Sequence, residues 1–212
     1  MDVPYMNDFE RGVNKMNLHE TYPQLQISQL YGFIEQVDGW LTHLEQTALL
    51  HLPALVDHLD GEIIEIGSFK GKSTVSLGLG SKWISERKRS IYAIDLFIPS
   101  IEYGEYYHDF EKNIRGYQLE NYVIPIKKYS HEALPECPER ISALFIDGDH
   151  NYLSVKKDIE LYSPRVEAGG MIAFHGYNVY EGVQRAVDEL CESKEYVYVC
   201  DYDRLRLIRK LN

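Results

Sequence analysis

Residues 62–74, with the sequence EIIEIGSFKGKST, decide the fold of this chain. A short, mainly apolar run leads into a turn at Gly67, and a helix-forming stretch follows Gly71. Such a run is typical of a parallel strand that is buried on both faces of a sheet. The order of strand, glycine turn and helix leaves backbone amides free at the helix start, where polar groups of a ligand can bind.

The same alternation continues to the end of the chain. Strands are predicted at 61–67, 90–95, 122–126, 142–147, 171–175, 196–200 and 204–210, and helices near 71–87, 107–119, 152–162 and 179–192. Alternating strands and helices predict an α/β fold with a doubly wound, seven-stranded, mostly parallel sheet. Only residues 201–203 separate the last two strands. This link permits a hairpin and no parallel crossover, so we expect the last strand to be antiparallel.

The chain of 212 residues is expected to form one structural unit. Residues 61–212 are assigned to the α/β domain, and residues 1–60 to a helical N-terminal addition without strands. Thr42 and Glu45 have the spacing of a capping box at a helix start. An apolar helix face follows at Leu49, Leu52, Val56 and Leu59. Pro53 is expected to break or kink this helix.

Composition and charge exclude several classes of protein. Hydrophobic residues make up 44% and charged residues 26%, close to the averages of globular proteins. No apolar run reaches the roughly 18 residues of a membrane helix, and the acidic start of the chain does not resemble a secretory signal. The three cysteines lie far apart, which indicates reduced thiols in a cytoplasmic protein.

The formal net charge is -11, and residues 1–65 carry 11 acidic against two basic side chains. A surface of this sign repels phosphate backbones, so nucleic-acid binding is disfavoured. The basic cluster at 204–210 alternates charged and apolar residues, and we interpret it as the solvated face of a sheet. A homo-oligomer remains open at this stage.

The glycine loop admits three interpretations. A phosphate-binding P-loop needs four residues between its glycines, but Gly67 and Gly71 enclose three. A dinucleotide fingerprint needs a glycine where Phe69 stands. A ligand with an ammonium group, such as S-adenosylmethionine, suits the carboxylate of Glu65 and is favoured. Asp95 ends the next strand, where an acidic residue accepts hydrogen bonds from ribose hydroxyls in doubly wound folds.

Polar residues gather at the ends of two later strands, where ligands bind in parallel sheets. Asp147 and Asp149 are two residues apart, so in extended backbone both are expected to face one side of the cleft. Asp149 is the first candidate for a general base, His175 the second and His150 the third. A role at the start of the following helix also explains Asp149. If His175 is the base, the rate should rise through roughly pH 6–7.

Five segments carry a resemblance to a known family: GWLTHLE (39–45), EIGSFKGKST (65–74), YAIDLF (92–97), FIDGDHNY (145–152) and AGGMIAFHGY (168–177). They resemble the class I S-adenosylmethionine-dependent methyltransferases. The most similar branch is that of the small-molecule O-methyltransferases, which includes macrocin-type sugar methyltransferases and, more distantly, catechol O-methyltransferase. The resemblance spans residues 39–210. It implies methyl transfer from S-adenosylmethionine to a hydroxyl of a sugar or another metabolite.

The resemblance also implies the residues that contact the cofactor, with Ser130 beside the adenine. These are Glu65, Gly67, Ser68, Gly71, Ser73, Asp95, Leu96, Ser130 and Asp147. Related enzymes hold a divalent metal with the aspartate at the position of Asp147 and an acidic pair after the next strand. Here His175 and Gly176 replace that pair, which argues against a magnesium site.

Two kinds of chemistry remain after the loss of the acidic pair. Either His175 joins in binding a softer metal, or the reaction is metal-independent acid–base catalysis, which the sequence favours. Two alternatives lie outside an active methyltransferase. One is an enzyme that uses residues 67–74 as an irregular P-loop, and the other is a cofactor-binding module that no longer reacts.

Overall fold

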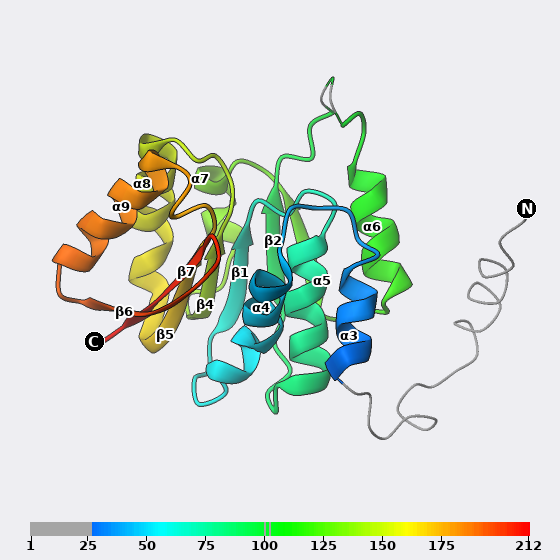
Figure 1. The fold of residues 1–212 in the computed structure, drawn as a ribbon, viewed down its shortest axis with the longest axis horizontal. Helices are drawn as coiled ribbons and strands as arrows, with labels where there is room; N and C mark the ends of the chain where they lie inside the picture. Colours follow the sequence, from blue (N-terminus) through cyan, green and yellow to red (C-terminus); the bar gives the residue numbers. More distant parts are fainter. Residues whose placement is uncertain (1–26, 100, 102) are drawn as a thin grey trace, which may run out of the picture.

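The computed structural model describes residues 27–99, 101 and 103–212, so the first 26 residues of the expected helical addition at 1–60 lie outside the described residues. One seven-stranded sheet forms the centre, with helices on both faces (Figure 1). Its strands are β1 (Glu62–Ile66), β2 (Ile91–Asp95), β3 (Val123–Lys127), β4 (Ile141–Ile146), β5 (Val166–Phe174), β6 (Tyr196–Tyr202) and β7 (Leu205–Lys210). The spatial order is β3-β2-β1-β4-β5-β7-β6.

The prediction of an antiparallel last strand is confirmed. Strands β1 to β5 pair in parallel, whereas β7 runs antiparallel to both β5 and β6. The sequence did not indicate that β7 lies between β5 and β6. Leu205, Leu207 and Ile208 of β7 are buried, while Val197 and Tyr198 of β6 are exposed. The inner strand β7 thus buries its leucine and isoleucine side chains, although β6 carries the larger share of apolar residues.

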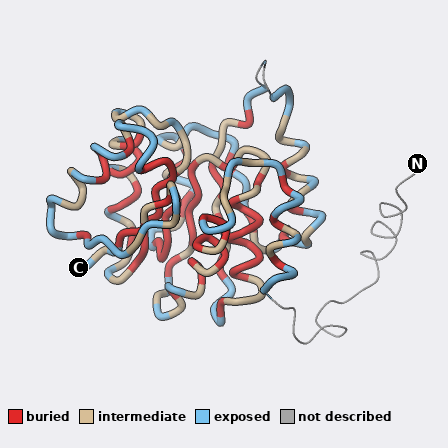
Figure 2. Tube along the Cα trace, in the orientation of Figure 1, coloured by how far each residue is buried: buried red, intermediate tan, exposed pale blue. Residues whose placement is uncertain are grey.

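Side chains that alternate along the strands build two cores, one on each face of the sheet. The first face packs against α3 (Ile27–Ile34), α4 (His43–Leu55), α5 (Lys72–Leu79) and α6 (Tyr107–Gly116). The second face packs against α7 (Ser130–Ala133), α8 (Tyr152–Tyr162) and α9 (Glu181–Glu192). Figure 2 shows the buried residues concentrated in the strands and on the inner sides of the helices. No described helix is long and apolar enough to cross a membrane.

Helix α4 confirms the predicted capping box. The Thr42 hydroxyl accepts a hydrogen bond from the Glu45 backbone N–H, and the Glu45 carboxylate accepts one from the Thr42 N–H. Leu49, one of the predicted apolar positions, is fully buried. Of the break or kink expected at Pro53, the break does not occur, since the helix continues for two more residues to Leu55. A proline so near the helix end disturbs only the last turn.

The predicted helix at 71–87 is shorter than expected. Helix α5 ends at Leu79, and one π-helical segment, η1 (Gly80–Ile84), follows it. A Cβ on Gly80 would lie 2.1 Å from the Leu50 carbonyl oxygen, so glycine lets η1 approach α4 closely. Two short 3₁₀ segments, η2 (Leu134–Glu136) and η3 (Ser163–Arg165), complete the described elements.

Strand β1 has β2 on one side and β4 on the other, and the chain order reverses at this point. In open parallel sheets, ligands bind at the carboxyl ends of the strands beside such a reversal. The loops after β1, β2 and β4 therefore define the place of the candidate site.

Candidate functional site

The glycine loop is held against its neighbours by backbone contacts. Gly67 has a φ of +90°, and a Cβ there would lie 2.2 Å from the Asp147 carbonyl oxygen. Glycine is thus required for the close approach of the ends of β1 and β4. The backbone amides of Ser68 and Phe69 donate to Asp95 Oδ2 at 3.0 and 2.9 Å. The Asp95 carboxylate thus accepts hydrogen bonds from the backbone amides that a P-loop would offer to phosphate. This argues against the interpretation of residues 67–74 as an irregular P-loop.

Asp95 accepts hydrogen bonds on both of its carboxylate oxygens. Besides the two loop amides on Oδ2, the Phe97 backbone N–H donates to Oδ1 at 2.7 Å and the Tyr106 hydroxyl at 3.1 Å. The Tyr106 hydroxyl is the side-chain donor among these four, and it comes from the segment just before α6. A ligand hydroxyl could take its place on Oδ1 without disturbing the loop amides.

Glu65 lies fully buried beneath the glycine loop. Its Oε2 accepts hydrogen bonds from the hydroxyls of Ser68 and Thr74, while Oε1 has no hydrogen-bond partner among the described residues. Burial raises the pKa of Glu65 to about 7, although hydroxyls such as that of Ser73 oppose the shift. The loop therefore covers a carboxyl group of which one oxygen accepts hydrogen bonds and the other does not.

Two cavities open at the carboxyl edge of the sheet, with volumes of about 550 and 490 Å³. Both are lined by Gly67, Asp95 and Gly148, so they adjoin along this line. Of the other predicted site residues, Leu96, Ser130 and Asp149 line the first cavity, and Asp147, His150 and His175 line the second. Glu65, Ser68, Gly71 and Ser73 line neither of the two.

Asp149 does not share a face with Asp147, and this expectation is wrong. Strand β4 ends at Ile146 and the chain bends at Gly148, so the two carboxylates point into different cavities. Asp149 is exposed and accepts hydrogen bonds from the backbone N–H of Asn151 at 3.0 Å and the hydroxyl of Ser154 at 2.9 Å. Its contacts are those expected for a residue at the start of α8.

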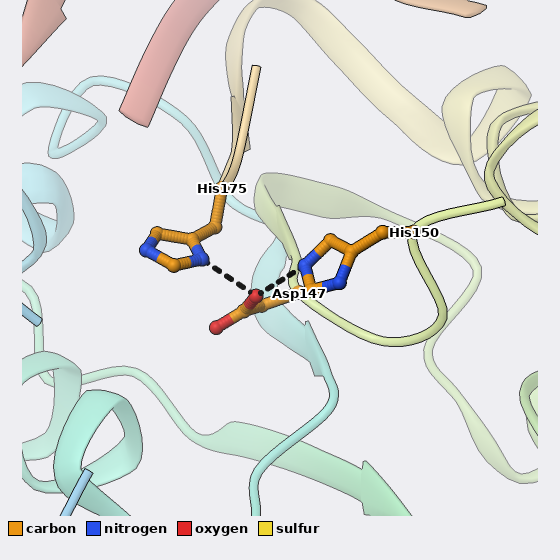
Figure 3. A group of neighbouring side chains, drawn as sticks. All are labelled: Asp147, His150 and His175. Carbon is orange, nitrogen blue, oxygen red and sulfur yellow. Dashed lines mark hydrogen bonds and ion pairs between the residues drawn. The ribbon is translucent and has the colours of Figure 1, made fainter. Parts of the chain in front are cut away.

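Asp147 joins two histidines instead (Figure 3). Its Oδ1 lies 2.8 Å from His175 Nδ1 and 3.2 Å from His150 Nε2. Asp147 follows β4 and His175 follows the neighbouring β5, so pairing of these strands brings them together. The His150 ring stacks on Tyr180, with ring centroids 4.1 Å apart. The chain therefore brings together one carboxylate and two imidazoles at the second cavity.

On its other side, His175 faces a buried carboxylate from α4. Its Nε2 lies 3.5 Å from Glu45 Oε2, a distance typical of an ion pair rather than a hydrogen bond. Arg204 donates to Glu45 from Nε at 3.1 Å and Nη2 at 3.0 Å, and also from its backbone N–H at 3.0 Å. Burial raises the Glu45 pKa, but the His175 imidazole and the hydrogen bonds from Arg204 and Thr42 outweigh burial and lower it to about 2.

Sequence reasoning missed this connection. Arg204 was assigned to a solvated sheet face, which is wrong, because it lies in the turn between β6 and β7 and binds Glu45. The capping box pointed to Glu45 only as a helix-start residue. No pattern in the sequence links a residue of α4 with one 159 positions later.

The electrostatic setting of His175 changes one further expectation. Burial to 5% exposure lowers its pKa, but the carboxylates of Asp147 and Glu45 outweigh burial and raise the pKa to about 9. His175 with these partners is protonated at neutral pH. A rate that rises through pH 6–7 is therefore not expected from His175 as the base.

Aromatic side chains form the rim of the second cavity. The Trp40 and Phe69 rings stack with centroids 4.8 Å apart, and Tyr103 packs edge-on against both. Tyr180 lines the same cavity beside His150. This cavity thus combines a flat apolar rim with a polar floor, an arrangement that suits a ring-shaped organic molecule.

A protein-family model described as "Methyltransferase domain" matches residues 64–177, more than half of the chain. The chain belongs to the class I S-adenosylmethionine-dependent methyltransferases. A curated relative is "Uncharacterized protein R132" of Acanthamoeba polyphaga mimivirus, 34% identical over 152 residues. The match covers 69% of this chain and 65% of the relative, so it spans about two thirds of that protein's length.

Solved methyltransferase structures share this fold at low sequence identity. The O-methyltransferase NovP superposes with a TM-score of 0.68 at 17% identity, over 80% of each chain. An O-methyltransferase from Bacillus cereus, determined in complex with SAH, gives a TM-score of 0.64 at 13% identity. That match covers 92% of this chain and 95% of the other. The predicted Rossmann-like methyltransferase fold is confirmed.

Proposed function

We propose that this methyltransferase transfers a methyl group from S-adenosylmethionine to a hydroxyl of a small molecule, a sugar or another metabolite. One observation carries the proposal: two cavities adjoin at Gly67, Asp95 and Gly148, and a carboxylate with two histidines lines one of them. In this arrangement one cavity receives the cofactor and the other receives the acceptor. S-adenosylmethionine supplies a methyl group that its sulfonium already activates.

The first cavity has the features that an adenosine requires. Asp95 accepts from ribose hydroxyls in place of the Tyr106 hydroxyl, while Leu96 and Ile98 provide apolar surface for the base. Ser130, whose hydroxyl donates to Asp158 at 2.5 Å, lines the same cavity. The unpartnered Oε1 of Glu65 beneath the loop is assigned as the acceptor for the cofactor's ammonium group, whose positive charge would favour the ionised carboxylate.

In the second cavity, this chain has to orient the acceptor and remove its proton. Methyl transfer from an activated donor depends mainly on alignment and on deprotonation of the acceptor oxygen. Asp147 and His150 line this cavity and are partly exposed, so they are the groups within reach of the acceptor hydroxyl. Asp149 lines the first cavity, so Asp147 and His150 take its place as candidates for the general base. The aromatic rim positions the acceptor ring.

Calorimetric titration of the protein with S-adenosylhomocysteine tests the cofactor site. Asp95→Ala removes the ribose acceptor, so we expect binding to weaken by about 1–3 kcal/mol. Asp201→Ala, on β6 and outside both cavities, is the matched control and should bind as the wild type does. Unchanged binding by Asp95→Ala would contradict the assignment. Cofactor binding without turnover of any hydroxylated acceptor would instead indicate a silent cofactor-binding module.

A further inference from the structure

Three side chains from separate segments converge at the floor of the second cavity. Asp147 follows β4, His150 precedes α8, and His175 follows β5. One donor atom from each lies within 4.8 Å of the other two (Figure 3). From this geometry we infer that Asp147, His150 and His175 form a binding site for a first-row transition-metal ion. This departs from the metal-independent chemistry that the sequence favours.

The surroundings of His175 support a role as metal ligand. Histidines that bind metals usually direct their second ring nitrogen at a carboxylate, which fixes the tautomer and the ring orientation. His175 turns Nδ1 toward Asp147 and Nε2 toward Glu45, at 2.8 and 3.5 Å. Glu45 is itself immobilised by Arg204 and by its place in the helix cap. To bind a metal, His175 would release its Nδ1 proton and keep the Nε2 proton that faces Glu45, so that the Nδ1 lone pair is directed toward Asp147 and His150.

His150 is also held in place. Its ring stacks on Tyr180, and Tyr180 needs the absence of a side chain at Gly176, where a Cβ would lie 2.5 Å from the tyrosine ring. An acidic residue at position 176 would therefore displace the ring that supports His150. Gly176, which stands where related enzymes have an acidic residue, thus allows Tyr180 to hold the His150 imidazole in place.

The donor set selects the kind of metal. Two imidazole nitrogens and one carboxylate oxygen suit Zn²⁺, Fe²⁺ or Co²⁺, whereas Mg²⁺ and Ca²⁺ prefer sites made of oxygen ligands. All three residues line the second cavity, so further coordination positions would face the space assigned to the acceptor. A metal there would bind the acceptor hydroxyl and lower its pKa, in place of direct proton removal by Asp147 or His150. That role rests on the proposed function, whereas metal binding itself does not.

Metal binding by the full chain tests the inference directly. Protein freed of metal with a chelator is titrated with Zn²⁺ and, separately, with Mg²⁺ by calorimetry, and Co²⁺ binding is followed by visible absorption. We expect one Zn²⁺ or Co²⁺ per chain and no comparable binding of Mg²⁺. Glu45→Gln should weaken Zn²⁺ binding about 10–100-fold, and His150→Ala and His175→Ala by at least that much. His108→Ala, an exposed histidine of α6, should have no effect.

Zn²⁺ binding of wild-type strength in His150→Ala would overturn the site, as would a preference for Mg²⁺. His150 is partly exposed, so this variant is expected to fold even if the buried His175→Ala variant does not. Titration of the metal-free protein with S-adenosylhomocysteine reports on the proposed function separately. Failure of metal binding with intact cofactor binding would leave the methyltransferase proposal standing.

Discussion

Glu65 shows how one buried residue couples the glycine loop to pH. Its carboxyl group lies in the core beneath the loop, with Oε2 bound to two hydroxyls and Oε1 unpartnered among the described residues. A buried carboxyl group with so few donors favours its neutral form. Its pKa accordingly rises from 4.5 to about 7, because burial outweighs the hydrogen bonds from the hydroxyls.

This shift predicts a pH-dependent stability. Since the folded state holds the proton more tightly than the unfolded state, the contribution of Glu65 is complete below about pH 4.5 and is lost as pH rises through about 7. Relative to Glu65→Gln, we expect the wild type to lose on the order of 3 kcal/mol of unfolding free energy between about pH 4 and 9. Urea unfolding of both proteins across this range measures the difference. Parallel pH profiles would show that Glu65 has no raised pKa.

At the scale of elements, the residues at the start of α4 do more than cap the helix. Thr42 accepts from the Glu45 N–H and donates its hydroxyl to Asp203 Oδ2 at 2.5 Å. The cap therefore orders the helix start, ties it to the turn before β7 and holds the carboxylate that faces His175. Thr42 thus links the capping box at the start of α4 to the candidate site.

Replacement of this cap tests its energetic weight. Thr42→Ala loses both hydrogen bonds of the hydroxyl, and we expect unfolding free energy to fall by about 1 kcal/mol, within the usual range for N-caps. Thr42→Ser keeps a hydroxyl at the same place and should retain most of the stability. Denaturant unfolding of the three proteins provides the comparison. If alanine and serine were equivalent, the hydroxyl contacts would carry no stability.

At the scale of the whole molecule, Arg204 joins two segments that lie far apart in the chain. It binds Glu45 of α4 from the β6–β7 turn and donates to the Trp40 carbonyl oxygen. Glu45 is fully buried, whereas the Arg204 side chain keeps 35% of its surface exposed. One ion pair thus connects α4, the β6–β7 turn and, through His175, the floor of the second cavity.

Removal of one partner should cost more than removal of both. Arg204→Met leaves the buried Glu45 carboxylate with His175 as its remaining cationic neighbour. We expect a loss of about 2–4 kcal/mol of unfolding free energy, less than for a fully buried pair because Arg204 is partly exposed. The double variant Arg204→Met, Glu45→Gln removes the uncompensated charge and should recover part of that loss. A double-mutant cycle with urea unfolding measures the coupling. Strictly additive losses would argue against a coupled pair.

The elements of this fold were readable from the sequence because they depend on neighbours along the chain. Apolar runs predicted the seven strands, the spacing of Thr42 and Glu45 predicted a helix start, and the short link at 201–203 predicted the hairpin. The place of β7 inside the sheet was not readable, since either strand of a hairpin can pair with β5. In the structure β7 pairs with β5 and β6 forms the edge of the sheet.

The sequence by itself determined the fold, the family and the presence of polar residues at the carboxyl edge of the sheet. Only the tertiary structure decided which of those residues meet. A bend at Gly148 separates Asp149 from Asp147, and strand pairing brings His175 to Asp147. Arg204 and Glu45 lie 159 positions apart and meet because α4 packs beside the β6–β7 turn. Periodicity reports the neighbours of a residue along the chain, whereas the chemistry of this site depends on contacts that packing alone creates.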